Sequence, residues 1–84
     1  MPANAYVLLK VVPEKTQEVL ARLREIPNAV VHEVLGPHDI VVELEADTNV
    51  DIRSIVSFKI RSIPHVTESV TCLWFEDTFH DAAG

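Results

Sequence analysis

The sequence predicts an α+β domain in which a four-stranded antiparallel sheet carries two helices on one face. The main observation is a phrase that occurs twice, as Arg24-Glu25-Ile26-Pro27-Asn28 and as Arg61-Ser62-Ile63-Pro64-His65. At each place an amphipathic segment ends on Arg-x-Ile, a proline prevents its continuation, and a valine-rich run follows. Two such halves in one short chain predict a ferredoxin-like βαββαβ sandwich, of the dimeric α+β barrel type.

The first three predicted strands come from apolar runs. Residues 5–12 are apolar on both alternating faces except at Lys10, which predicts a central strand that is covered on two sides. Residues 30–35 and 40–46 flank Gly36-Pro37-His38-Asp39, which is the only strong turn signal between strands. These two runs are therefore expected to pair as a hairpin.

Two amphipathic helices are expected between the strands. The first opens at Pro13 and runs to Ile26, with Thr16 as its expected N-cap. The second is capped by Asp47-Thr48-Asn49. Its expected buried stripe consists of Ile52, Ile55, Val56, Ile60 and Ile63.

The chain is expected to form one domain followed by a short tail. The fourth strand is predicted over residues 66–75, the domain over residues 1–76, and a C-terminal tail without periodicity over residues 77–84. A chain of 84 residues buries only about 60–65% of its unfolded surface, so a partner subunit is expected to contribute to stability.

Composition and charge exclude several classes of function. The net charge is −6 and the seven basic residues are scattered, which argues against direct binding to nucleic acid. A single cysteine, Cys72, excludes an internal disulfide and fits a reducing compartment. The N-terminus lacks a signal peptide, and no apolar run approaches the roughly 20 residues of a membrane span, so a cytoplasmic location is expected.

One face of the predicted sheet has more apolar groups than a solvated face usually carries. In the first strand Tyr6, Leu8 and Val12 alternate with the set 7, 9 and 11, and only one of these sets can meet the helices. An exposed apolar sheet face usually marks a subunit interface, so dimerisation through the sheet is expected.

Three other classes of protein with this fold match the sequence poorly. An RNA-recognition motif places stacking aromatics on its central strands, where this chain has Tyr6 together with Glu43 and Glu45. A metallochaperone of this fold carries Cys-x-x-Cys after its first strand, and an ACT domain typically has glycine there. This chain has Pro13-Glu14-Lys15 at that place.

The sequence resembles the effector-binding RAM domain of the Lrp/AsnC regulators over residues 5–75. The resemblance rests on Ala5-Tyr6-Val7-Leu8-Leu9-Lys10-Val11, on the hairpin Gly36-Pro37-His38-Asp39-Ile40, and on Arg61-Ser62-Ile63-Pro64-His65-Val66-Thr67. The glycine-x-x-aspartate hairpin before an apolar strand is its most specific part. Because the chain starts at the first RAM strand, without a helix-turn-helix domain, a stand-alone RAM protein is expected.

The resemblance implies a homodimer, possible rings of dimers, and a small effector, usually an amino acid, bound beside the hairpin. Asp39 is then expected to accept the ammonium group, and the turn at Gly36, where a positive φ is expected, to offer backbone N–H groups to the carboxylate. The ordinary alternative is a plain turn and a solvated strand face. The candidate ligand-binding residues are Gly36, Pro37, His38, Asp39, Ile40, Thr67, Ser69 and Thr71.

The predicted function is therefore effector sensing and oligomerisation that modulates transcription through a DNA-binding helix-turn-helix partner or a paralogue of the same family. Neither a cofactor nor enzymatic activity is expected. His32, His38, His65, His80 and Cys72 lack the local spacing of a zinc site, although the tail Asp77-His80-Asp81 can chelate weakly. The alternative that remains open is a metal-binding or enzymatic member of the dimeric α+β barrel scaffold.

Overall fold

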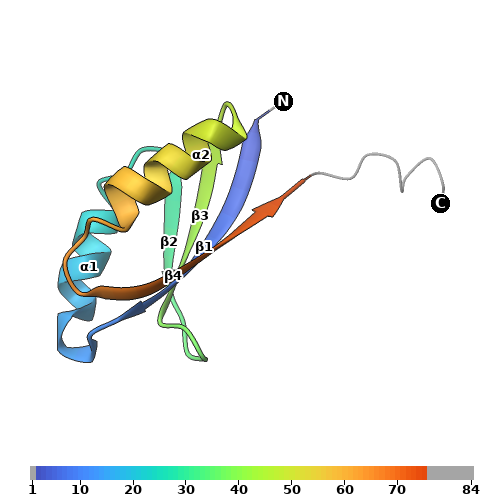
Figure 1. The fold of residues 1–84 in the computed structure, drawn as a ribbon. Coiled ribbons are helices and arrows are strands. Elements are labelled where there is room, and N and C mark those ends of the chain that lie inside the picture. The colour runs from blue at the N-terminus through green and yellow to red at the C-terminus, as the bar shows by residue number, and fades with distance from the viewer. Residues whose placement is uncertain (1, 76–84) are drawn as a thin grey trace, which may run out of the picture.

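A computed structural model describes residues 2–75 and confirms the predicted βαββαβ order (Figure 1). The elements are β1 (Ala3–Val11), a 3-10 turn η1 (Pro13–Lys15), α1 (Thr16–Leu23), β2 (Ala29–Glu33), β3 (Ile40–Ala46), α2 (Asn49–Ile55), a π-helical turn η2 (Val56–Ile60) and β4 (Val66–Trp74).

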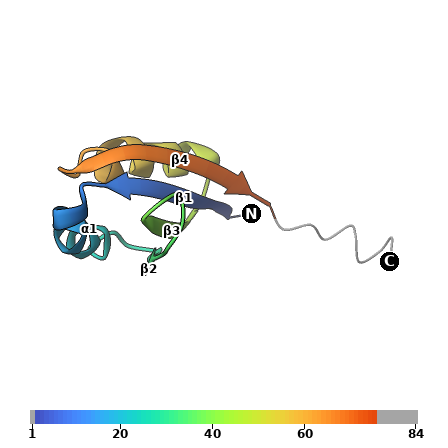
Figure 2. The same cartoon turned by 90° about the horizontal axis from the view of Figure 1, so that it is seen from below.

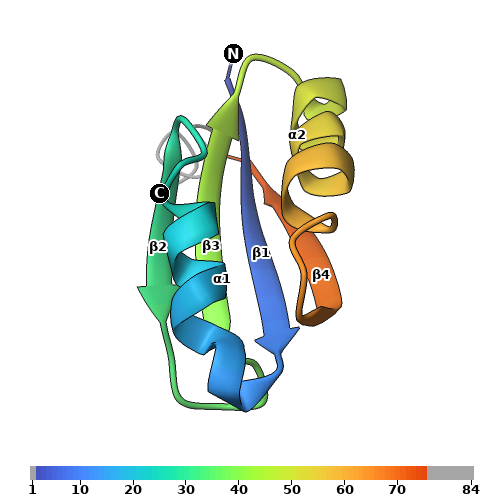
Figure 3. The same ribbon diagram turned by 90° about the vertical axis from the view of Figure 1, so that its left-hand side faces the viewer.

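The four strands form one antiparallel sheet in the order β2-β3-β1-β4, with both helices on the same face (Figure 3). The two long strands, β1 and β4, lie side by side when the molecule is seen from below (Figure 2). The two central strands pair Val7 with Val42, and β1 pairs Tyr6 with Cys72 on its other side. The first strand of the chain, β1, is therefore one of the two central strands of the sheet.

The core lies between the sheet and the helices. Every second residue of β1 faces the helices and is buried, and the intervening residues face the opposite side. This confirms that one alternating set of the first strand meets the helices. The prediction that the strand is covered on both sides is wrong for a single chain, because both described helices lie on the same face of the sheet (Figure 1). Leu9, Leu20, Leu23, Ile40, Ile52 and Ile60 are among the largest fully buried side chains.

The two helices begin differently, although Thr16 was expected to cap the first and the segment Asp47-Thr48-Asn49 the second. Thr48 is the N-cap of α2, and its hydroxyl oxygen accepts a hydrogen bond from the backbone N–H of Asp51 at 3.1 Å. Thr16 lies inside α1 instead, and its hydroxyl donates to the carbonyl of Pro13 at 3.0 Å. The prediction of Thr16 as a cap is wrong, because the 3-10 turn that precedes the helix supplies a nearby carbonyl.

The repeated phrase forms the same corner twice. After α1 the N–H of Ile26 donates to Leu23 O at 3.0 Å, and after η2 the N–H of Ile63 donates to Ile60 O at 3.0 Å. The next proline is followed in both corners by a residue with positive φ, namely Asn28 at 61° and His65 at 77°. In both corners the chain reverses through a left-handed residue and enters a strand.

The β2–β3 connection is longer than predicted. Strand β2 ends at Glu33, two residues before the expected Leu35, whose side chain is fully exposed. Residues 34–39 are therefore a loop rather than a tight turn. No helix in the described part of the chain is long and apolar enough to cross a membrane.

Candidate functional site

Asp39 anchors the β2–β3 loop to the end of β1. Its backbone N–H donates to Leu9 O at 2.8 Å, and its carboxylate oxygen Oδ2 accepts the backbone N–H of Val11 at 3.0 Å. Its carbonyl accepts the N–H of Val34 at 2.9 Å and so closes the loop on itself. The pairing of β1 with β3 ends at Leu9 and Ile40, so the carboxylate satisfies an N–H of β1 just beyond the last paired residue.

The start of β4 contacts the other edge of β1, where the pairing of the two strands is irregular between Lys10 and Val11. The hydroxyl of Thr67 donates to Lys10 O at 3.2 Å, and Nε2 of His38 lies 3.0 Å from Oε2 of Glu68. The fold thus brings the predicted residues His38, Asp39 and Thr67 together around the end of β1. Glu68 joins this group although sequence reasoning did not select it.

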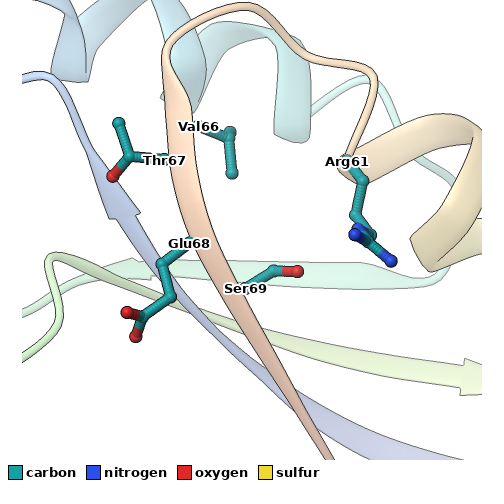
Figure 4. A pocket seen from close by; sticks show the side chains of 5 residues that line it. All are labelled: Arg61, Val66, Thr67, Glu68 and Ser69. Carbon is teal, nitrogen blue, oxygen red and sulfur yellow. The ribbon is translucent and has the colours of Figure 1, made fainter.

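An open pocket of about 200 Å³ surrounds the edge of β4 at this end (Figure 4). Figure 4 shows Arg61 and Ser69 on one side of the strand, and Thr67 with Glu68 on the other. Arg61 was not predicted as a site residue, although it belongs to the repeated phrase. The lining residues are Arg61, Val66, Thr67, Glu68 and Ser69.

The remaining predicted residues are not part of this pocket. Gly36 and Pro37 are exposed in the loop, and Thr71 lies further along β4 opposite Val7. The side chain of Ile40 is completely buried in the core, where it cannot contact a ligand. Of the eight predicted residues, only Thr67 and Ser69 line the pocket.

The expected strain at Gly36 is absent. Gly36 does not have a positive φ, and a Cβ added to it meets nothing within 4 Å. The prediction that the turn requires glycine is wrong, because the six-residue loop reverses direction without a left-handed residue. Asn28 and His65 hold the positive φ angles of the described chain instead.

The face of the sheet opposite the helices, here called the open face, is a second candidate site. Tyr6 is 38% exposed and Val70 is 40% exposed, and the rings of Tyr6 and Trp74 stack with centroids 5.8 Å apart. Cys72, paired with Tyr6 in register, is exposed among them rather than buried as a small apolar residue. An apolar surface of this kind is suited to contact with another protein.

Metal-binding groups do not gather in the described part of the chain. Residues 2–75 contain no group of three histidine, cysteine or acidic side chains that can hold a metal ion. His32 contacts Glu43 at 3.3 Å, and His65 lies 3.9 Å from Glu18. The tail group Asp77-His80-Asp81 lies outside the described residues.

The four-stranded antiparallel sheet with two helices on one face defines a small α+β domain of the ferredoxin-like class. The family model for the Lrp/AsnC ligand binding domain matches residues 4–83. The chain therefore belongs to the Lrp/AsnC ligand-binding domain family. A comparison with curated proteins finds no significant match.

Solved structures show the same fold in proteins of two lengths. TTHA0845 from Thermus thermophilus is 25% identical, with a TM-score of 0.84 over 89% of this chain and 95% of that one. The hypothetical protein PHS023 from Pyrococcus horikoshii is 27% identical, with a TM-score of 0.81 over 95% and 96%. The transcriptional regulator NMB0573 from Neisseria meningitidis, solved in complex with L-Met, shares only the fold, at 11% identity and a TM-score of 0.80. The match spans 90% of this chain and 51% of that regulator.

Proposed function

We propose that this chain is an effector-sensing and oligomerising module that binds an amino acid at the β2–β3 loop and modulates transcription through a helix-turn-helix partner. The observation that carries this proposal is the junction of loop and strand. Asp39 is bonded to Val11, and His38 contacts Glu68, so that loop, β1 and β4 meet at one point. A ligand bound at this junction touches three elements at once.

The junction supplies the charges that a zwitterion requires. Within the described residues only one carboxylate oxygen of Asp39 accepts a hydrogen bond, so the second is assigned to the ammonium group of the effector. Glu68 and the hydroxyl of Thr67 lie on the same side of β4 (Figure 4). The carboxylate of the effector is assigned to the backbone N–H groups of Gly36 and His38, because Pro37 between them has none. The L-Met complex of the structurally similar regulator supports an amino acid as the ligand class.

The open face supports the oligomerising role. Tyr6 and Val70 lie on the side of the sheet away from both helices, because Tyr6 alternates with buried residues of β1 and Val70 pairs in register with Leu8. A second copy of the chain is the proposed cover for this face. Because Glu68 pairs in register with Lys10 and lies on the side of β4 away from Arg61, the proposed effector site adjoins one end of the open face.

A thermal-shift screen of the twenty amino acids tests the effector site. A ligand present at 100 times its dissociation constant stabilises the protein by about 2.7 kcal/mol, which is readily detected. We expect Asp39→Asn to weaken binding of the best amino acid by one to two decades, because a charge-assisted hydrogen bond contributes about 1.5–3 kcal/mol. Asparagine retains an oxygen for the N–H of Val11, whereas Asp39→Ala also destabilises the fold.

Two further variants serve as controls for this assignment. Glu33→Gln makes the same carboxylate-to-amide change on the same hairpin at an exposed position and is expected to leave binding unchanged. Arg61→Gln changes the side of β4 away from Glu68 and is also expected to have little effect. Loss of binding in Arg61→Gln with normal binding in Asp39→Asn would place the effector on the helix side of β4 and contradict the role of Asp39.

A further inference from the structure

The outer surface of the helix layer carries a groove between the two helices. Figure 3 views this layer face-on, with α1 on the left and α2 on the right. A pocket of about 260 Å³ lies between the end of α1 and η2, and Arg22, Phe58 and Lys59 are among its lining residues. We call this pocket the interhelical groove. It lies on the side of the sheet opposite the open face and shares no lining residue with the pocket at the edge of β4.

Phe58 gives the groove an exposed aromatic ring. Its side chain is 78% exposed, whereas Val56 and Ile60 on either side of it in η2 are buried in the core. The turn is π-helical, because the N–H of Arg61 donates to Val56 O, five residues earlier, at 2.8 Å. The hydroxyl of Ser62 donates to Phe58 O at 2.7 Å. Such turns are rare and are often found at functional sites, and aromatic side chains are enriched where proteins contact partners.

The charges around Phe58 favour an acidic partner. Arg22 and Lys59 line the groove with it, and neither makes an ion pair within residues 2–75. Glu25 is the single carboxylate in the lining. The chain as a whole has a net charge of −6, so two unpaired cations beside an exposed aromatic ring are a local exception. Opposite charges at an interface speed association and restrict the choice of partner.

The surface becomes acidic toward the start of α2, which limits the extent of an acidic partner segment. A neighbouring pocket of about 350 Å³ shares Lys59 with the groove and is lined by Glu45, Asp47 and Asp51. Like charges repel a carboxylate there. The acidic residues of a partner are therefore expected to contact the groove between Arg22 and Lys59 and not to extend beyond Lys59.

We propose that the interhelical groove docks a short acidic segment of the DNA-binding partner. A large apolar side chain of that segment packs on Phe58, and the carboxylates beside it pair with Arg22 and Lys59. The identity of the partner rests on the proposed function, whereas the chemistry of the segment rests on the groove alone. The domain then uses its helix layer for the partner and one end of its sheet for the effector.

A fluorescein-labelled peptide of sequence Gly-Asp-Glu-Leu-Phe-Glu-Asp tests this chemistry on the full chain, with its dissociation constant measured by fluorescence anisotropy. We expect Phe58→Ser to weaken binding at least about tenfold, because the ring supplies most of the apolar contact. The double variant Arg22→Gln, Lys59→Gln is expected to weaken binding about four- to ninefold, since each exposed ion pair contributes a factor of about two to three.

Val50→Ser and Arg53→Gln are the matched controls on α2. Val50 is 68% exposed, and neither residue lines the groove, so both variants are expected to bind the peptide as the parent does. A peptide with Asn and Gln in place of Asp and Glu separates charge from apolar contact. The parent is expected to bind it as weakly as the double variant binds the acidic peptide. Circular dichroism confirms that each variant is folded.

Equal binding of the peptide by the parent, Phe58→Ser and the double variant would overturn the proposal, as would the absence of binding to the parent. Binding only to a chain without residues 76–84 would also overturn it, because that segment has three acidic side chains and one phenylalanine and would itself be the occupant. A smaller oligomer in sedimentation of Phe58→Ser would assign the groove to a second copy instead. None of these results bears on the effector site, which the amino-acid screen tests separately.

Discussion

The residue that turns the chain after each helix is not glycine but Asn28 or His65, each with a positive φ. The repeated Ile-Pro phrase predicts the corner, since proline ends the helix and an apolar residue anchors it. It does not predict which residue becomes left-handed, because that depends on how the corner must close onto the following strand. Gly36 permits such a conformation but its loop does not need it. A residue that can adopt a positive φ therefore does not show that the fold requires a positive φ at that position.

Asp39 shows why a binding residue is hard to assign from sequence. Its position in a glycine-x-x-aspartate hairpin was interpreted as a ligand contact, yet one of its oxygens accepts an N–H from Val11, 28 residues earlier in the chain. Whether a carboxylate faces a ligand or its own backbone depends on where the pairing with a strand distant in sequence ends. The hairpin and the presence of a carboxylate at position 39 were predictable from the sequence. The hydrogen bond from Val11 to Asp39 and the contact of Glu68 with His38 were not.

Substitutions at Asn28 test the left-handed corner. Asn28→Ala is expected to destabilise the fold by about 1 kcal/mol, since alanine keeps the Cβ that clashes with the backbone at positive φ but lacks the local hydrogen bonding by which asparagine tolerates that conformation. Asn28→Gly relieves that clash and is expected to remain within about 1 kcal/mol of the parent, because glycine loses more chain entropy on folding. Urea unfolding measures both. The backbone bond from Glu45 N to Asn28 O survives either change, so an equal loss in the two variants would contradict this account.

At the level of elements, periodicity predicted every strand and helix, and the errors concern their ends. The strands of the sheet differ from the predicted ranges by no more than two residues at either end. Helix ends depend on local hydrogen bonds that compete with one another, which a pattern of apolar residues does not report. Thr48 and Thr16 are the two outcomes of that competition: one accepts from the helix N-terminus, and the other donates to a preceding carbonyl.

The two threonines give a matched test of helix capping. Thr48→Ala removes the acceptor for the N–H of Asp51 and is expected to lower the free energy of unfolding by about 1 kcal/mol. Thr16→Ala removes only a hydroxyl that donates at an exposed site, and its effect is expected to stay within about 0.5 kcal/mol. Thr48→Ser keeps the capping oxygen and should retain most of the stability in the same chemical denaturation experiment. A larger loss for Thr16→Ala than for Thr48→Ala would show that the cap is misassigned.

At the scale of the whole molecule, alternation along β1 identified two faces but not which of them the helices cover. The structure resolves this because the smaller side chains Ala3 and Ala5, with Val7, meet the helices, and Tyr6 and Leu8 remain on the open face. A short chain of this size has a limited core, so a face that stays apolar and open is a source of further stability through association. The location of the site follows from the same arrangement, since strand order brings the loop to the start of β4.

The last prediction is that two copies of the chain associate through the open face. At micromolar concentration, sedimentation velocity is expected to show a dimer or a multiple of dimers rather than a 9.4 kDa monomer. Val70→Glu places a charge in the middle of the open face and should raise the dissociation constant by at least about tenfold, because burying an unpaired carboxylate costs several kcal/mol. Val50→Glu makes the same change on α2, where the parent side chain is 68% exposed, and should leave the dimer intact. Trp74 is the only tryptophan and stacks on Tyr6 in this face, so its fluorescence reports dissociation on dilution. Equal weakening by both variants would assign the interface to the helix layer as well, and a parent that sediments as a monomer would leave the open face without its proposed cover.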